Sequence, residues 1–247
     1  MYGPHASRRL GLSLGVDLTP MTCTFNCIYC ERGKTRFGCK DFRDFTAHVE
    51  MEIFQYSLRQ RMKTGTRFDC LTFAGTGEPT LEPRLGEFIA MAKKIIGKRA
   101  IKVITNSSLL NHDEVIRNLT ETDEVIAKLN TVSDDVFTEM YRPYNKTLNV
   151  ERIIKGLHLL KRNIESRMTI EVLFLRSYQQ IKTNHNDVEV EKITHILQEL
   201  EPEKVQIHTI KRFPAEPYVL QVNKRFLDMV SIYMRRKLPK TEVLPYI

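Results

Sequence analysis

The sequence predicts an α/β protein whose parallel strands curl into a partial (β/α)6, TIM-like barrel. From residue 11 onward, short runs with strand character alternate with longer segments of helical periodicity. Repeated βα units joined by right-handed crossovers place their strands parallel in one sheet. In addition, each polar or glycine-rich motif follows an expected strand, where such folds carry their chemistry. An open doubly wound sheet is the alternative topology.

Six strands and seven helices are expected along the chain. The strands cover residues 12–18, 70–73, 101–104, 124–129, 168–175 and 204–210. The helices cover residues 44–63, 83–97, 112–119, 134–141, 149–163, 187–200 and 223–236. No repeat or Gly/Ser-rich linker interrupts this pattern, so a single domain is expected over residues 1–247. Its core covers about 11–210, and about 211–247 form a C-terminal extension.

Composition limits the function classes. The chain has 247 residues, of which 42% are hydrophobic, enough for a sizeable core. The formal charge of +8 is compatible with a polyanionic partner such as RNA, although scattered charge also serves simply to solvate a surface. No apolar run approaches the roughly 18 residues of a membrane span, and the first ten residues lack a secretory signal. A cytoplasmic protein without membrane association is therefore expected.

Three of the five cysteines lie within eight positions, in Cys23-Thr-Phe-Asn-Cys27-Ile-Tyr-Cys30. Such spacing is typical of ligands rather than of a disulfide framework. A 4Fe-4S cluster normally takes four thiolates, so three on one loop leave one iron open to another ligand. The alternative is a zinc site completed by a histidine or by Cys39, although zinc sites usually contain two ligand pairs.

Two further motifs follow the second and third expected strands. The segment Gly75-Thr-Gly77-Glu78-Pro-Thr contains glycines that allow a ligand to approach the backbone closely. It is not a phosphate loop, because no Gly-Lys-Ser/Thr follows. The segment Thr-Asn106-Ser-Ser108 offers polar side chains, or serves only as a helix-capping turn.

The last three expected strands add polar residues. Lys128 and Asn130 share one side by the period of two, and either could reach a ribose or a substrate. Glu171 interrupts an apolar strand, so it is expected to be paired and to face a polar cavity. His208 shares a face with Gln206 and is either a substrate-side residue or a satisfied core histidine.

The cysteine spacing C-x3-C-x2-C, with Tyr29 before the last cysteine, resembles the signature of the radical S-adenosylmethionine (SAM) superfamily. The resemblance implies a 4Fe-4S cluster held by Cys23, Cys27 and Cys30 and SAM as the second cofactor. It implies that Gly75, Gly77 and Glu78 grip the methionine amino group of SAM. The full set of expected cofactor-binding residues is Tyr29, Gly75, Gly77, Glu78, Asn106, Ser108, Lys128, Asn130, Glu171 and His208.

Longer segments resemble one branch of that superfamily, the Fe-S oxidoreductases related to wyosine synthesis on transfer RNA. They are Ser-Arg-Arg-Leu-Gly-Leu-Ser-Leu-Gly before the cysteines, Gly-Glu-Pro-Thr-Leu, Thr-Asn-Ser-Ser-Leu, and Gln-Ile-His-Thr with Pro-Ala-Glu. The wyosine enzymes hold a second cluster with additional N-terminal cysteines, and this sequence has none before Cys23. Only Cys39 and Cys70 are left over, so no auxiliary cluster is expected.

The resemblance implies an enzyme that cleaves SAM reductively, forms a 5′-deoxyadenosyl radical and modifies a substrate. A tRNA or a protein is the expected substrate, because a large substrate itself helps to exclude water from an open barrel. The expected electron donor is an external flavodoxin- or ferredoxin-like protein. Two alternatives stay open: an activase that installs a glycyl radical on a partner enzyme, and a non-catalytic Fe-S or zinc binding module.

Overall fold

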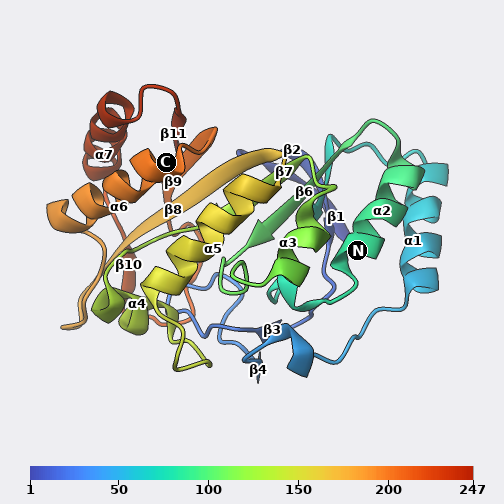
Figure 1. Cartoon of the computed structure of the whole chain (residues 1–247), viewed down its shortest axis with the longest axis horizontal. Helices are drawn as coiled ribbons and strands as arrows, with labels where there is room; N and C mark the ends of the chain where they lie inside the picture. Colours follow the sequence, from blue (N-terminus) through green and yellow to red (C-terminus); the bar gives the residue numbers. More distant parts are fainter. Residues whose placement is uncertain (247) are drawn as a thin grey trace.

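The structure, a computed structural model, describes residues 1–246 and contains one large curled sheet (Figure 1). In these residues nine strands form this sheet, in the order β1-β2-β5-β6-β7-β8-β9-β11, with β10 paired to β8. The strands from β2 to β11 in this order are parallel, whereas β1 and β10 pair antiparallel. The expected partial barrel of parallel strands is thereby confirmed.

The strand bounds are β1 Tyr2–Ser7, β2 Gly11–Val16, β5 Cys70–Phe73, β6 Ala100–Thr105, β7 Glu124–Lys128, β8 Arg167–Ser177, β9 Lys204–Thr209, β10 Val219–Gln221 and β11 Glu242–Tyr246. A separate two-stranded sheet consists of β3 Thr22–Cys23 and β4 Phe37–Gly38. The helices are α1 Met51–Lys63, α2 Leu85–Ile96, α3 Asp113–Leu119, α4 Asp134–Tyr141, α5 Val150–Asn163, α6 Asp187–Leu200 and α7 Lys224–Lys237. Two short 3-10 helices cover Phe42–Asp44 and Pro79–Leu81.

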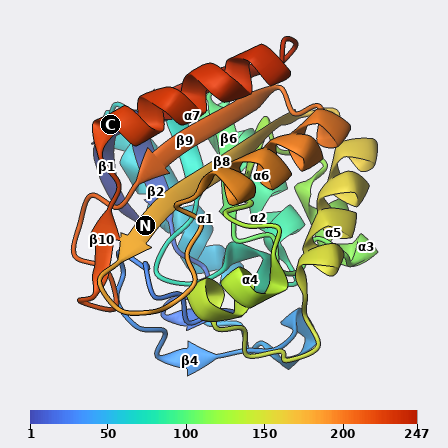
Figure 2. The same cartoon turned by 90° about the vertical axis from the view of Figure 1, so that its left-hand side faces the viewer.

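The two faces of the curled sheet differ sharply in character. One row of neighbouring residues across five strands is apolar and buried: Val16, Phe73, Val103, Val125 and Met168. The adjacent row, which points to the other face, is Gly15, Thr72, Lys102, Glu124 and Arg167. Helices pack along the outer side of the curve (Figure 2), so the apolar row faces them and the polar row faces the inside of the barrel.

The expected helix over 44–63 begins only at Met51. Arg84 Nη2 donates a hydrogen bond at 3.0 Å to the carbonyl of Val49, and Glu50 has an extended backbone. This contact holds the preceding segment outside the helix. The first expected strand ends at Val16, and the carboxylate of the next residue, Asp17, accepts hydrogen bonds from the amide and hydroxyl of Thr76.

The ends of the chain add strands that the sequence pattern did not predict. β1 pairs with β2, and β11 continues the parallel sheet beyond β9. The segment after residue 211 thus supplies both the expected helix, α7, and a further strand of the barrel. Ile247, the last residue of the expected extension, lies outside the described residues. None of the helices in residues 1–246 has the length and apolar character needed to cross a membrane.

Candidate functional site

The three clustered cysteines lie on the loop that follows β2, at the carboxyl end of the parallel strands. Cys23 is in β3, and its carbonyl accepts a hydrogen bond at 3.0 Å from the Cys39 amide. Further along, the Ile28 amide donates to the carbonyl of Met140 at 3.0 Å, which anchors the loop to α4. All three thiols are free and their residues are half-buried. The loop therefore presents three thiols from a fixed backbone.

The surroundings of two of these thiols, those of Cys23 and Cys27, oppose ionisation. Burial, together with the nearby Glu78 carboxylate, raises the pKa of Cys23 to about 12. Burial, then the charges of Cys23 and Cys30, raise the pKa of Cys27 well above its ordinary value. Three thiols close enough to repel one another as thiolates are stabilised together when iron supplies positive charge. The donor set thus fits a cluster bound through three sulfurs.

The remaining cysteines point elsewhere. Cys39 Sγ donates at 3.1 Å to the carbonyl of Asp41, and Cys70, at the opposite end of the sheet, donates at 3.4 Å to the carbonyl of Leu10. Within residues 1–246, no group of three or more His, Cys, Asp or Glu side chains is arranged to hold a single metal ion. The alternative of a zinc site completed by Cys39 gains no support from the contacts of that thiol.

The glycine-rich segment packs against the residues just before the cysteines. A Cβ on Gly77 would lie 1.9 Å from the carbonyl oxygen of Thr19 and 2.1 Å from that of Thr22. A Cβ on Gly75 would overlap the carboxyl group of Asp17. The glycines are thus required for close approach of two loops, since no side chain fits between them. The Glu78 amide donates to Thr22 at 3.0 Å, so part of this backbone is already used within the protein.

Glu78 is only 2% exposed and is surrounded by neutral donors. Its Oε1 accepts from the Thr80 amide at 3.1 Å, from Thr80 Oγ1 at 2.7 Å and from Thr105 Oγ1 at 2.7 Å. Its Oε2 accepts from the Asn106 amide at 2.7 Å. Burial raises the pKa of the carboxyl group above its usual range, and these hydrogen bonds offset part of the rise. Oε2, with one described donor, retains capacity for another.

Asn106 connects the end of β6 to the cysteine loop. Its Nδ2 lies 2.8 Å from Thr24 Oγ1 and 3.4 Å from Cys23 Sγ, to both of which it donates. Its Oδ1 accepts from the Ser108 amide at 2.9 Å, and the Ser108 and Thr24 hydroxyls are 2.7 Å apart. Asn106 therefore contacts the Cys23 sulfur directly, whereas Ser108 contacts Thr24, the residue that follows Cys23.

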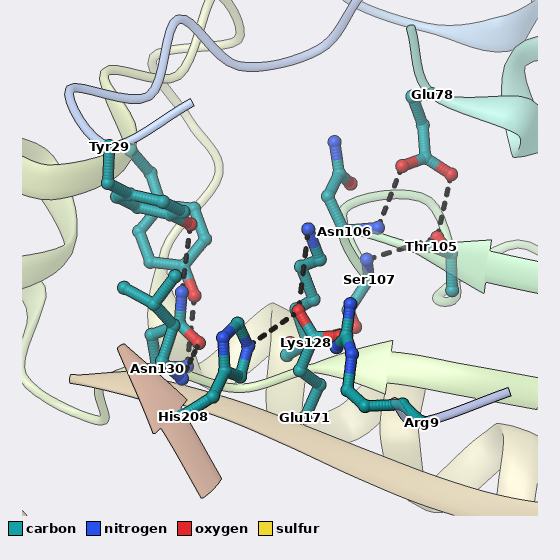
Figure 3. Close-up of polar contacts among 12 residues, drawn as sticks. Arg9, Tyr29, Glu78, Thr105, Asn106, Ser107, Lys128, Asn130, Glu171 and His208 are labelled. Atoms are coloured by element: carbon teal, nitrogen blue, oxygen red, sulfur yellow. Dashed lines mark hydrogen bonds and ion pairs between the residues drawn. The ribbon is translucent and has the colours of Figure 1, made fainter. Parts of the chain in front are cut away.

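A second buried carboxylate, that of Glu171 on β8, is surrounded by basic side chains. Arg9 Nη1 pairs with Oε2, while His208 Nε2 and Lys128 Nζ lie 3.1 and 3.6 Å from Oε1 (Figure 3). We call Arg9, Lys128, Glu171 and His208 the Glu171 cluster. Although burial opposes ionisation, these three side chains hold the pKa of Glu171 well below its usual range. The expected pairing of Glu171 is thus present.

Lys128, a member of the Glu171 cluster, is also close enough to the cysteine loop for the charges of Cys27 and Cys30 to act on it. Burial works against its charge, yet Glu171 and then the thiolates of Cys27 and Cys30 raise its pKa. Its carbonyl accepts from Ser107 Oγ at 2.9 Å, which ties the end of β7 to the end of β6. Lys128 is therefore a protonated side chain that faces the Glu171 carboxylate on one side and, on the other, thiols that become negative when they bind metal.

The strand period predicted that Asn130 lies on the same side as Lys128, but in the structure it does not. β7 ends at Lys128, so the alternation no longer applies, and Asn130 turns into the core with 0% exposure. Its Oδ1 accepts from the Leu173 amide and its Nδ2 donates to Tyr29 Oη, both at 2.9 Å. The expectation that Asn130 reaches a ribose or substrate is corrected: the side chain supports Tyr29, itself buried behind Cys27.

The loop after β9 contacts the cysteine loop. Glu31, directly after Cys30, accepts from the amides of Lys211 and Arg212 at 2.8 and 3.2 Å. Arg142, which caps the end of α4, donates to Glu216 Oε1 at 2.6 Å. These contacts join loops from distant parts of the sequence around the three cysteines.

Sequence reasoning missed three residues of the site. Arg9 was noted only as part of a family-like segment, and its partner Glu171 is 162 positions away, so no local pattern indicates the pair. Thr24 and Thr105 hold Asn106 and Glu78 in place. Their only signal was their position beside a cysteine and at a strand end.

Comparison with known proteins places the chain in a family. A sequence model described as the Radical SAM superfamily matches residues 19–188. A UPF0026 protein of Synechocystis sp. is 30% identical over 225 residues, which cover 90% of this chain and 77% of that protein. A UPF0026 protein of Methanocaldococcus jannaschii is 31% identical over 221 residues, covering 88% of this chain and 65% of that protein.

Other relatives share only part of their length with this chain. A protein named GTPase Obg from Brachyspira hyodysenteriae is 30% identical over 234 residues, but the chain spans only 33% of it. A probable dual-specificity RNA methyltransferase RlmN from Thermotoga petrophila is 24% identical over 221 residues, with 59% of its length covered.

Solved structures resemble the fold at low sequence identity. Streptococcus suis SuiB bound to the precursor peptide SuiA has a TM-score of 0.70 at 14% identity, covering 96% of this chain and 49% of SuiB. The structure of TYW1 with a lysine-pyruvate adduct has a TM-score of 0.65 at 15% identity, covering 92% of this chain and 74% of TYW1. The fold is therefore shared with these proteins.

Proposed function

The chain belongs to the radical SAM superfamily, and on that premise we propose that it is an enzyme that cleaves SAM reductively at a 4Fe-4S cluster. Cys23, Cys27 and Cys30 hold three irons of the cluster and leave the fourth for SAM. When bound, the cluster and SAM supply a 5′-deoxyadenosyl radical that abstracts hydrogen from a substrate.

One observation carries the proposal most strongly: the cysteine loop and the Gly75–Glu78 segment are held together at the carboxyl end of one parallel sheet. The Glu78 amide bonds to the residue before Cys23, and Asn106 contacts both Glu78 and the Cys23 sulfur. Three thiols beside a carboxylate with an unused acceptor position suit a ligand that carries an amino group. Methionine in SAM carries that group.

The residues around the cysteine loop have separate roles in the proposed binding of the cluster and SAM. Glu78, through Oε2, accepts from the amino group of SAM, and Gly75 and Gly77 permit the loop to lie against the cysteine loop. Asn106 and Ser108 position Cys23, and Asn130 positions Tyr29 behind Cys27. Lys128 stays protonated and balances the negative charge of the thiolates.

The proposal is tested by anaerobic reconstitution with iron and sulfide, followed by incubation with SAM and dithionite. We expect about four irons per chain, on the count for one cubane, and formation of 5′-deoxyadenosine measured by mass spectrometry. Cys27→Ala should lose the cluster and the product. If the unaltered chain carries a full cluster but forms no 5′-deoxyadenosine, the result would instead support a non-catalytic Fe-S module.

Cys39→Ala is the matched control, because Cys39 lies on the same loop but its thiol donates to a backbone carbonyl. We expect this variant to bind iron and form 5′-deoxyadenosine as the unaltered chain does. A loss of bound metal in Cys39→Ala equal to that in Cys27→Ala would contradict the assignment of three ligands and revive the zinc alternative.

For the substrate we propose a macromolecule, with a flavodoxin- or ferredoxin-like protein as the electron donor. Relatives named as RNA methyltransferases and a structural neighbour bound to a precursor peptide support a large substrate. The net charge of +8 favours RNA over an unselected protein, since phosphates attract basic surfaces. Retention of tRNA by the reconstituted chain in a low-salt filter assay, lost at high salt, is the expected result.

A further inference from the structure

We propose that Asn106, through the hydrogen bond from its side chain to the Cys23 sulfur, raises the reduction potential of the bound 4Fe-4S cluster. The inference rests on the proposed function and deepens it, because it names a residue that adjusts how readily the cluster accepts an electron. Asn106 acts through Cys23, as a positioning residue, and its effect is measured as a potential.

The side chain of Asn106 supplies a donor to a sulfur that is assigned to the metal. Asn106 directly follows β6, and its Nδ2 lies 3.4 Å from Cys23 Sγ. Nδ2 also lies 2.8 Å from Thr24 Oγ1. A side-chain amide nitrogen carries two N–H groups, one for each of these acceptors. Asn106 can therefore bond to the sulfur and to the cysteine loop at the same time.

The orientation of the Asn106 amide is fixed by its neighbours. Its Oδ1 accepts from the Ser108 amide at 2.9 Å, and a backbone N–H can only donate. The reversed orientation would turn Nδ2 toward the Ser108 N–H and Oδ1 toward the Cys23 sulfur, so two bonds would be lost. The nitrogen, and not the oxygen, therefore faces the sulfur.

The residues around this hydrogen bond are closed to solvent. Thr24 and Ser108 are 2% and 3% exposed, and their hydroxyl oxygens lie 2.7 Å apart. A hydrogen bond in such surroundings acts more strongly on the charge of its acceptor than one in water, because the effective dielectric constant is lower. The Asn106 side chain is thus placed where a single donor has a measurable effect.

The direction of the effect follows from the charge that reduction adds. One electron from the external donor makes the cluster and its thiolates more negative. An N–H group directed at a ligating sulfur stabilises that added charge and favours the reduced state. Removing the donor should therefore shift the potential to a more negative value.

The backbone of Asn106 has a separate contact that the test has to preserve. Its amide donates to Glu78 Oε2 at 2.7 Å (Figure 3). Asn106→Ala removes Nδ2 but keeps this amide, so the group assigned to SAM retains its donor.

An anaerobic redox titration of the reconstituted chain, followed by electron paramagnetic resonance of the reduced cluster, tests the inference. For Asn106→Ala we expect a ratio of reduced to oxidised cluster that is about tenfold lower at a fixed potential. This ratio corresponds to a midpoint potential about 59 mV more negative for one electron. The variant should still bind about four irons per chain.

Asn186→Ala is the matched control. Asn186 Oδ1 accepts from the Glu189 amide at 2.9 Å, and its Nδ2 donates to the carbonyl of Thr183 at 3.1 Å. The change thus removes the same two kinds of contact at the start of α6, where neither partner is a sulfur. We expect the midpoint potential of the unaltered chain.

Asn106→Asp is a second variant that keeps an acceptor for the Ser108 amide but has no N–H group for the sulfur. We expect its potential to fall at least as far as that of Asn106→Ala, because an ionised oxygen then lies beside Cys23. This variant tests the inference even if Asn106→Ala fails to bind iron.

Three results would overturn the inference. They are an unchanged potential in either Asn106 variant that binds its irons, an equal shift in Asn186→Ala, and loss of iron from both Asn106 variants. The last would give Asn106 a purely structural role. Failure of the proposed function is distinct, because it is read as absence of 5′-deoxyadenosine from the unaltered chain, whatever the potentials are.

Discussion

Two buried glutamates at the same end of one sheet, Glu78 and Glu171, have opposite surroundings. Each is 2% exposed. Glu78 accepts four hydrogen bonds from neutral groups and its pKa is raised, whereas Glu171 faces three basic side chains and its pKa is held well below the usual range. The difference shows that burial alone does not set the charge of a carboxyl group. Its partners decide whether ionisation is favoured.

The difference also assigns different tasks to the two sides of the barrel. A carboxylate held by neutral donors attracts a cationic ligand, because nothing nearby cancels its charge. A carboxylate paired with cations is itself neutralised. The β5–β6 side therefore suits an ammonium group, whereas the carboxylate on β8 is already paired within the protein.

The largest effect on stability is expected for Glu171→Gln. The change leaves Arg9 and Lys128 without their counter-charge, and breaking a buried ion pair costs about 3 kcal/mol or more. We expect the lower end of that range, since both cations keep part of their surface in water. Urea unfolding at pH 7 measures the change in the free energy of unfolding.

The loss of unfolding free energy in Glu171→Gln should depend on pH in a way that distinguishes Glu171 from Glu78. The folded-state pKa of Glu171 lies below 4.5, its ordinary value, so its stabilisation is fully present above pH 4.5 and disappears as the pH falls through the folded-state pKa. The difference in free energy of unfolding between the unaltered chain and Glu171→Gln should therefore stay constant from neutral pH down to pH 4.5. It should become smaller only below pH 4.5. A deficit that narrows already between pH 7 and 5 would contradict the assigned pairing.

A smaller effect with the opposite pH trend is expected for Glu78→Gln. The amide NH2 of glutamine faces either the Asn106 amide or the two threonine hydroxyls, so one donor loses its acceptor at about 1–3 kcal/mol. Because the folded-state pKa of Glu78 is raised, its contribution is complete below pH 4.5 and is lost as the pH rises through the folded-state pKa. The difference in free energy of unfolding between the unaltered chain and Glu78→Gln should therefore become smaller from pH 4 to pH 7, as measured by the same urea unfolding assay.

Thr105→Val should have the smallest effect. The change keeps the side-chain shape but removes one of the four hydrogen bonds to Glu78, worth about 1 kcal/mol. It should also raise the pKa of Glu78 further, because a donor that favours the ionised form is gone. An unchanged free energy of unfolding at pH 7 would show that the remaining three donors satisfy the carboxylate.

Much of the barrel could be predicted from the sequence because its strands are locally distinctive. The strand over 70–73 and the helices over 134–141 and 187–200 have their expected bounds, since each is a short apolar run or a strong amphipathic period. The cysteine loop was recognisable for the same local reason. The spacing of its three cysteines within eight positions is visible in the sequence without any knowledge of distant contacts.

What escaped prediction depends on contacts between distant segments. β1 contains Gly3 and Pro4, and β11 contains Pro245, so neither has a strand-like composition, yet each pairs with a stronger neighbour. Arg9 joins Glu171 only because the sheet curls, and the buried position of Asn130 depends on where β7 stops. Periodicity within one segment contains none of this information.

Glu31 gives the arrangement a mechanical consequence. Its carboxylate grips two consecutive backbone amides of the loop after β9, and it follows the last cysteine without a spacer. The backbone position of Cys30 and that of the loop after β9 are therefore tied through a single side chain. A displacement of either segment has to break these two hydrogen bonds or move the other segment with it.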